Sequence, residues 1–100
     1  MALKKWIPTT NLLMLRRMGK LMEESSELSA VAARCIIQGI DEIDPGSGKT
    51  NRQRLHDELA DVLAQISCTI ADLDIDKESI GVRVRDKVDQ MAEWEAMFKE

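Results

Sequence analysis

The sequence predicts an all-α fold: a long-helix bundle of about three helices per protomer, completed by oligomerisation. Apolar residues recur at steps of three and four along three long stretches, which is the pattern of a helix with one apolar face. Only two prolines interrupt the 100 residues, and no alternating apolar pattern indicates a strand. One hundred residues are enough for one domain, so we expect a single unit over 1–100.

The first helix is expected to begin after a proline, with Thr9 or Thr10 as its N-cap. Its apolar pattern continues to Ile36, and a glycine at position 39 predicts its end. Gly19 lies inside this span and costs about 1 kcal/mol relative to alanine. The sequence therefore leaves open a kink or a split at Gly19.

The segment 41–51 is rich in turn residues and predicts a loop. Asn51 is a suitable N-cap for a second helix, which should run to about Leu73. A short connection then leads to a last helix from about Lys77. Its apolar residues follow helical spacing at Ile80, Val84, Val88, Met91, Trp94 and Phe98.

The first helix carries more apolar surface than the other two helices can cover. An amphipathic stripe of that length must meet another surface. We therefore expect an obligate homo-oligomer, in which helices from two protomers form four-helix arrangements.

Composition excludes several classes of protein. With 44% hydrophobic and 32% charged residues, the chain has no apolar run long enough to span a membrane and no signal-peptide pattern, so we expect a cytoplasmic protein without a membrane partner. Cys35 and Cys68 are expected to be free thiols on apolar helical faces. The net charge of −4 argues against binding to nucleic acid.

Two pairs of acidic residues have the spacing i, i+3, which places both side chains of a pair on one helical face. Glu24 and Glu27 form the first pair, and Glu58 and Asp61 form the second. Glu24 falls inside an apolar stripe, where a desolvated carboxylate costs several kcal/mol unless it is paired or binds a metal. Convergence of the four carboxylates predicts a divalent-metal site, whereas solvated or ion-paired acids are the alternative.

These pairs and their surroundings resemble the MazG-like all-α nucleoside triphosphate pyrophosphohydrolases. The family signature is ExxE, a spacer of a few tens of residues, and ExxD. Here it reads Glu24-Ser-Ser-Glu27, thirty residues (58 − 27 − 1), and Glu58-Leu-Ala-Asp61, within the segments "KLMEESSEL" and "DELADVLAQI". The resemblance covers about residues 15–70, and it implies a homodimer or homotetramer.

The resemblance implies hydrolysis of a nucleoside triphosphate, ribo or deoxyribo, to the monophosphate and pyrophosphate, for control of the nucleotide pool. Hard oxygen ligands favour Mg²⁺, with Mn²⁺ as a substitute. Glu24, Glu27, Glu58 and Asp61 would be the metal ligands, and the catalytic candidates are Glu24 and Glu23. The competing hypothesis is a non-enzymatic oligomeric helical interaction protein, for which the acidic pairs are ordinary surface.

Cations near the acidic pairs are candidates for binding the triphosphate. Arg16 and Lys20 lie on the same side of the first helix as Glu24, and Lys87 on the last helix belongs to a further basic group. The alternatives are solvated charges and a Lys20–Glu24 ion pair. Base binding is assigned to Trp6 and Asn11, which precede the acidic motif in the region that shapes the base pocket of related enzymes.

The segment "GSGKT" resembles part of a phosphate-binding P-loop, but Ile43 stands where that motif needs glycine and no strand is expected before it. Lys49 remains a candidate for a mobile phosphate contact. His56 is the only histidine and lacks the Glu-x-x-His pattern of di-iron bundles, so we expect it to be solvated or to cap a helix.

Overall fold

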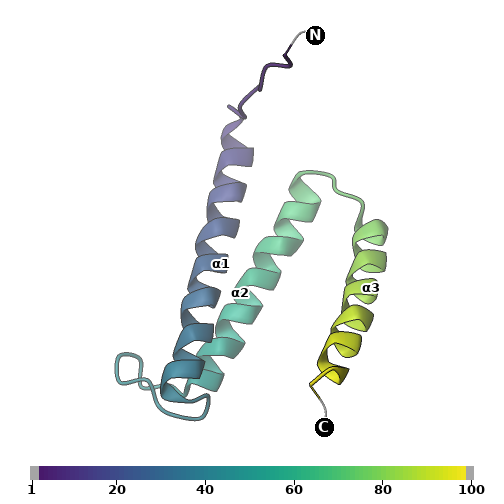
Figure 1. The fold of residues 1–100 in the computed structure, drawn as a ribbon. Helices are drawn as coiled ribbons and strands as arrows, with labels where there is room; N and C mark the ends of the chain where they lie inside the picture. The colour runs from purple at the N-terminus through teal and green to yellow at the C-terminus, as the bar shows by residue number, and fades with distance from the viewer. Residues whose placement is uncertain (1–2, 99–100) are drawn as a thin grey trace.

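A computed structural model describes residues 3–98, which form three helices joined by two connections (Figure 1). The helices are α1 Leu12–Gln38, α2 Asn51–Asp72 and α3 Lys77–Ala96. The predicted all-α class is confirmed: between residues 3 and 98, β pairing is limited to one isolated bridge between Ile43 and Thr50.

The N-cap of α1 is Asn11, so the prediction of Thr9 or Thr10 was wrong by one or two residues. The Asn11 side chain accepts a hydrogen bond from the Met14 backbone N–H at 3.0 Å, which satisfies an amide that has no partner inside the helix. The helix continues without a break through Gly19, so the predicted alternative of a split at that position was wrong.

The N-cap of α2 is Thr50 and not Asn51 as predicted. Thr50 and Gln53 form a capping box: the Gln53 N–H donates to Thr50 Oγ1 at 3.1 Å, and the Thr50 N–H donates to Gln53 Oε1 at 3.0 Å. This reciprocal pair fixes the start of the helix, and it leaves Asn51 free for other contacts as the first helical residue.

Helices α1 and α2 are joined by the loop 39–50 and pack side by side as an antiparallel pair (Figure 1). Near the start of α1, Arg17 reaches across to α2, with Nε 2.9 Å from Asp72 Oδ2 and Nη1 3.2 Å from Gln65 Oε1. Val31 is the one buried apolar residue in the described part of the chain. The polar contacts of Arg17 therefore supplement a small apolar core.

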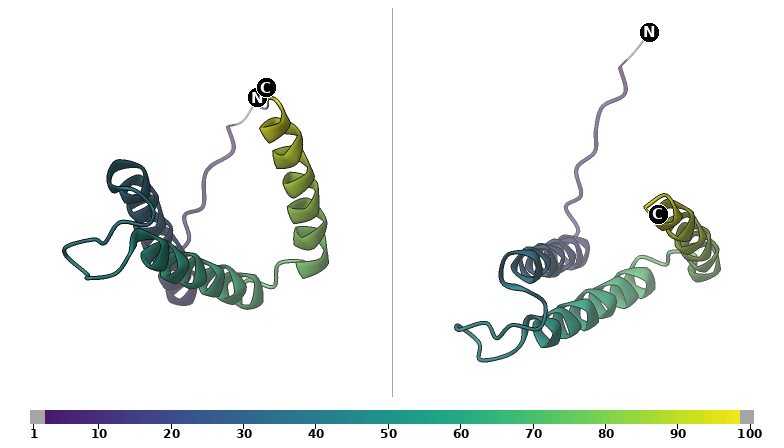
Figure 2. Two further views of the ribbon diagram at one scale, coloured as in Figure 1. Left: turned by 90° about the horizontal axis from the view of Figure 1, so that it is seen from below. Right: turned by 60° about the horizontal axis from the view of Figure 1, so that its bottom comes forward.

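Helix α3 makes no comparable contact with α1 or α2 in the described structure, and Figure 2 shows it turned away from the pair. The Cα radius of gyration is 18.1 Å, whereas a compact domain of this length has about 13 Å. Apolar side chains on α1 and α3 consequently remain exposed, for example Ile36 at 86% and Val88 at 62%. One copy of the chain does not bury its own apolar stripes.

None of the three helices is both long enough and apolar enough to cross a membrane, as judged over the described residues.

Candidate metal centre

Three acidic side chains meet where the middle of α1 faces α2. Glu24 and Glu27 come from α1 and Glu58 from α2, and each offers a carboxylate oxygen within 4.8 Å of the other two. We call these three residues the carboxylate trio. Their convergence requires both the i, i+3 spacing on α1 and the alignment of α2 along α1.

Asp61, the fourth predicted ligand, lies outside this 4.8 Å group, and its side chain is exposed. It is nevertheless close enough for its charge to raise the pKa of both Glu24 and Glu58. The structure therefore places Asp61 beside the carboxylate trio, as a neighbouring negative charge.

Two oxygens of the carboxylate trio are buried without a hydrogen-bond partner: Oε2 of Glu24 and Oε2 of Glu58. Buried polar atoms in proteins nearly always have a partner, so each of these oxygens requires an explanation. A cation between the helices would provide the missing interaction for both. Closely spaced carboxylate oxygens, without histidine or thiolate, are the donor set that suits Mg²⁺ or Mn²⁺.

The electrostatics of the carboxylate trio favour a bound cation. Burial raises the pKa of Glu24, and a hydrogen bond and charge repulsion from Glu27 raise it further, while Lys20 opposes the shift. Burial also raises the pKa of Glu58. The negative charges of Glu27 and Asp61 raise this pKa further, while the positive charge of Arg54 opposes the shift. Both carboxylates are thus destabilised in their charged forms, and a divalent cation would relieve that repulsion.

Glu23 and Lys20 bond to each other on the exposed surface of α1. Lys20 Nζ lies 3.3 Å from Glu23 Oε2, so its ion-pair partner is Glu23 and not Glu24 as the alternative interpretation assumed. Arg16 is also exposed on α1. The structure therefore leaves Glu23 outside the carboxylate trio and places Lys20 within electrostatic reach of Glu24.

The remaining predicted site residues are not brought to the carboxylate trio within one copy. Lys87 lies on α3, which does not pack on α1 and α2. Trp6 is 94% exposed in the extended segment before α1. Asn11 caps α1, thirteen residues before Glu24 and hence about 20 Å along the helix axis.

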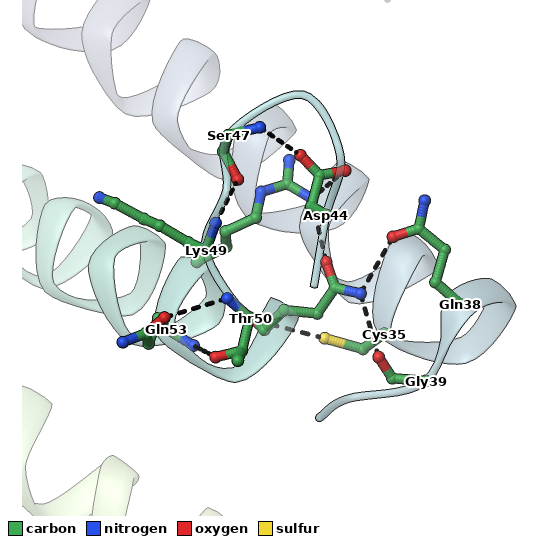
Figure 3. Close-up of polar contacts among 10 residues, drawn as sticks. Cys35, Gln38, Gly39, Asp44, Ser47, Lys49, Thr50 and Gln53 are labelled. Atoms are coloured by element: carbon green, nitrogen blue, oxygen red, sulfur yellow. Dashed lines mark hydrogen bonds and ion pairs between the residues drawn. The ribbon is translucent and has the colours of Figure 1, made fainter. Parts of the chain in front are cut away.

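The loop before α2 does not form a phosphate cradle (Figure 3). Its backbone amides are used internally: the Ser47 N–H donates to Asp44 Oδ2 at 2.9 Å, and the Lys49 N–H donates to Ser47 Oγ at 3.3 Å. The Lys49 ammonium pairs with Asp57 at 3.0 Å. His56 is exposed beside Asp57, as expected for a solvated histidine.

Reasoning from the sequence missed a half-buried cation close to the carboxylate trio. Arg54 Nη1 lies 3.1 Å from Asn51 Oδ1 and 3.5 Å from Asp44 Oδ1, and its charge lowers the pKa of Glu58. Arg54 precedes Glu58 by four residues, and this i, i+4 spacing is the signal that would have identified it.

The chain matches no protein-family model, no curated protein and no solved structure. The resemblance to the MazG-like enzymes therefore rests on the two acidic motifs and their surroundings alone. The geometry of the carboxylate trio stands independently of that resemblance.

Proposed function

We propose that this chain is a Mg²⁺-dependent nucleoside triphosphate pyrophosphohydrolase of the MazG-like class. It would convert a ribo- or deoxyribonucleoside triphosphate to the monophosphate and pyrophosphate, in the service of nucleotide-pool control in the cytoplasm. The main support is a single observation: three carboxylates from two helices converge, and two of their buried oxygens have no hydrogen-bond partner.

Glu24, Glu27 and Glu58 would hold the ion, and Asp61 would add negative charge beside it. When bound, Mg²⁺ or Mn²⁺ supplies positive charge to phosphate oxygens and lowers the pKa of water. The carboxylates contribute fixed negative charge on rigid helices, and Glu23 and Glu24 are the candidates for accepting a proton.

Lys20 and Arg16 would bind the outer phosphates. They precede Glu24 by four and eight residues, hence by about 6 and 12 Å along α1. Among the residues that the structure describes, Lys20 pairs only with Glu23, and this pair is exposed. Exposed ion pairs are worth about 0–1 kcal/mol. A triphosphate can therefore displace Glu23 from Lys20 at little cost.

A homodimer or homotetramer is part of the proposal. An open face of α3 carries apolar residues such as Val84 and Val88 together with the cation Lys87. Within the described residues of one copy, neither α1 nor α2 packs against this face of α3 as they pack against each other. A second copy would bury this face and bring Lys87, and Trp6 from the extended segment, towards a substrate that the carboxylate trio alone does not enclose.

The alternative is a non-enzymatic oligomeric helical interaction protein. The exposed apolar side chains of α1 and α3 favour it as much as they favour an oligomeric enzyme. It provides no partner for the buried oxygens of Glu24 and Glu58, which is why the enzyme is preferred.

A panel of ribo- and deoxyribonucleoside triphosphates, each assayed for pyrophosphate release with and without Mg²⁺, tests the proposal. At least one triphosphate should release pyrophosphate only with Mg²⁺, and Glu27→Gln should abolish the release. Glu78→Gln, at the exposed start of α3, is the matched control and should retain activity. Absence of Mg²⁺-dependent release across the panel, from a folded protein, would favour the interaction protein.

A further inference from the structure

Asn51 is completely buried, with 0% exposure, although it is a polar residue at the start of a helix. Its side-chain Nδ2 donates to Gln38 Oε1 and to the Gly39 carbonyl, each at 3.0 Å. Its Oδ1 accepts from Arg54 Nη1 at 3.1 Å. Both N–H donors and the oxygen of the amide side chain thus have a hydrogen-bond partner, as burial of an amide requires.

The backbone of Asn51 adds two contacts to the same region. Its N–H donates to the Glu42 carbonyl at 3.0 Å, and its carbonyl accepts from the Cys35 thiol at 3.8 Å. Figure 3 shows Cys35, Gln38 and Gly39, at the end of α1, gathered around the first turn of α2. One short side chain consequently ties the end of α1, the loop and the start of α2 together.

This junction lies on the same helix as the α2 member of the carboxylate trio. Asn51 precedes Glu58 by seven residues, which is two helical turns and about 10 Å along the axis. A slip of α2 by one residue shifts it by about 1.5 Å and turns it by about 100°. Metal coordination tolerates displacements of only about 0.5 Å, so the register of α2 determines whether Glu58 can join Glu24 and Glu27.

Helix capping does not account for the burial of Asn51. Thr50 and Gln53 already cap α2 through their reciprocal hydrogen bonds, and these bonds involve no atom of α1. At the far end of the pair, the long side chain of Arg17 holds Asp72 and Gln65 with partial exposure, and can follow a small slip. The buried amide of Asn51 cannot.

We propose that Asn51 is a positioning residue: its buried amide sets the register of α2 against α1 and thereby places Glu58 beside Glu24 and Glu27. The proposal rests on the proposed function in one respect, namely that the carboxylate trio binds a metal. The register itself does not depend on that function.

The test compares Asn51→Ala with Thr50→Ala, which weakens the cap of the same helix without loosening α2 from α1. Mn²⁺ alone is titrated into each folded variant and followed by electron paramagnetic resonance, well below both melting temperatures. Asn51→Ala should weaken Mn²⁺ binding at least tenfold, and Thr50→Ala should stay within twofold of wild type despite a lower melting temperature. Equal effects of the two substitutions would overturn the proposal.

A second measurement uses no metal: the ¹³C resonances of the side-chain carboxyl groups of the carboxylate trio. Asn51→Ala should shift them and Thr50→Ala should not. If wild type binds no Mn²⁺, the proposed function fails, and these resonances alone test whether Asn51 sets the register of α2. Unchanged resonances in Asn51→Ala would overturn the proposed role of Asn51.

Gln38 gives a further comparison if Asn51→Ala does not fold. Gln38→Met removes the acceptor for the Asn51 amide at similar size, whereas Gln38→Glu retains it. Gln38→Met should shift the carboxyl resonances of the carboxylate trio. Gln38→Glu should leave the carboxyl resonance of Glu58 at its wild-type position. Identical spectra for the two Gln38 variants would contradict the role of Asn51.

Discussion

Replacing Glu58 by glutamine should make the metal-free protein more stable. Glu58 has a raised pKa because burial and the neighbouring acids disfavour its charge, and one of its oxygens is buried without a partner. Glu58→Gln removes the charge at constant shape. The introduced amide can donate to the oxygens of Glu24 and Glu27, which lie within 4.8 Å of Glu58.

The size of the effect follows from the hydrogen bond that the variant gains. A hydrogen bond to a charged group contributes about 1.5–3 kcal/mol, and the solvent exposure of Glu27 reduces this to about 1 kcal/mol. For a domain of this length, that corresponds to an increase in Tm of about 4–8 °C. With divalent metal at about 100 times its Kd, wild type should gain about 2.7 kcal/mol and overtake the variant, whose Tm should not respond.

Thermal unfolding followed by circular dichroism, with EDTA and then with a series of Mg²⁺ and Mn²⁺ concentrations, measures this inversion. Glu23→Gln is the matched control. It also removes one negative charge, from α1 next to Glu24, but the only interaction lost is an exposed ion pair with Lys20. Its Tm should change little, and its metal response should persist. A Glu58→Gln variant less stable than wild type in EDTA, or a wild-type Tm indifferent to both metals, would refute the reasoning.

Three further predictions concern the phosphates, the pH and the assembly. Lys20→Ala should raise KM for the triphosphate about tenfold, because one charged hydrogen bond is lost, and it should retain Mn²⁺ affinity. Unchanged KM and kcat would mean that Lys20 is only a surface ion-pair partner. In EDTA, Tm should fall as pH rises from about 5 to 7, because folding raises the pKa of two members of the carboxylate trio above the unfolded value of about 4.3. Tm should also fall as pH decreases below about 3.9, the unfolded value, because folding lowers the pKa of Asp41 through its hydrogen bond with Arg52. A Tm that increases steadily from pH 5 to 7 would contradict the first of these two trends. Val88→Asp should dissociate the oligomer in sedimentation experiments, because Val88 lines the uncovered face of α3; a monomeric wild type would contradict it.

Helical periodicity was sufficient to predict the three helices and the pairing of Glu24 with Glu27. The i, i+3 spacing on α1 fixes that geometry locally, with no need for tertiary information. The caps were displaced by one or two residues because several neighbouring side chains can accept from the same amides. Asn11 and Thr50 prevail where the backbone is extended just before the helix.

Two features of the site depend on packing that periodicity does not encode. An apolar stripe on α3 shows which face is apolar and not which surface covers it, so the separation of α3 from the pair was not predictable. Asn51 had the residue type of a cap, and only the approach of Gln38 and Gly39 from α1 makes its burial possible. The alignment of Glu58 with α1 likewise depends on the junction between the helices.

The most direct test is the location of Mn²⁺ by anomalous X-ray scattering from crystals grown with the ion. An anomalous peak should lie between α1 and α2, within coordination distance of oxygens from Glu24, Glu27 and Glu58, at about 2.0–2.2 Å. The peak should be absent in crystals of Glu58→Gln grown in the same way. Ordered helices without a peak at the carboxylate trio, or with Mn²⁺ bound only elsewhere, would contradict the account.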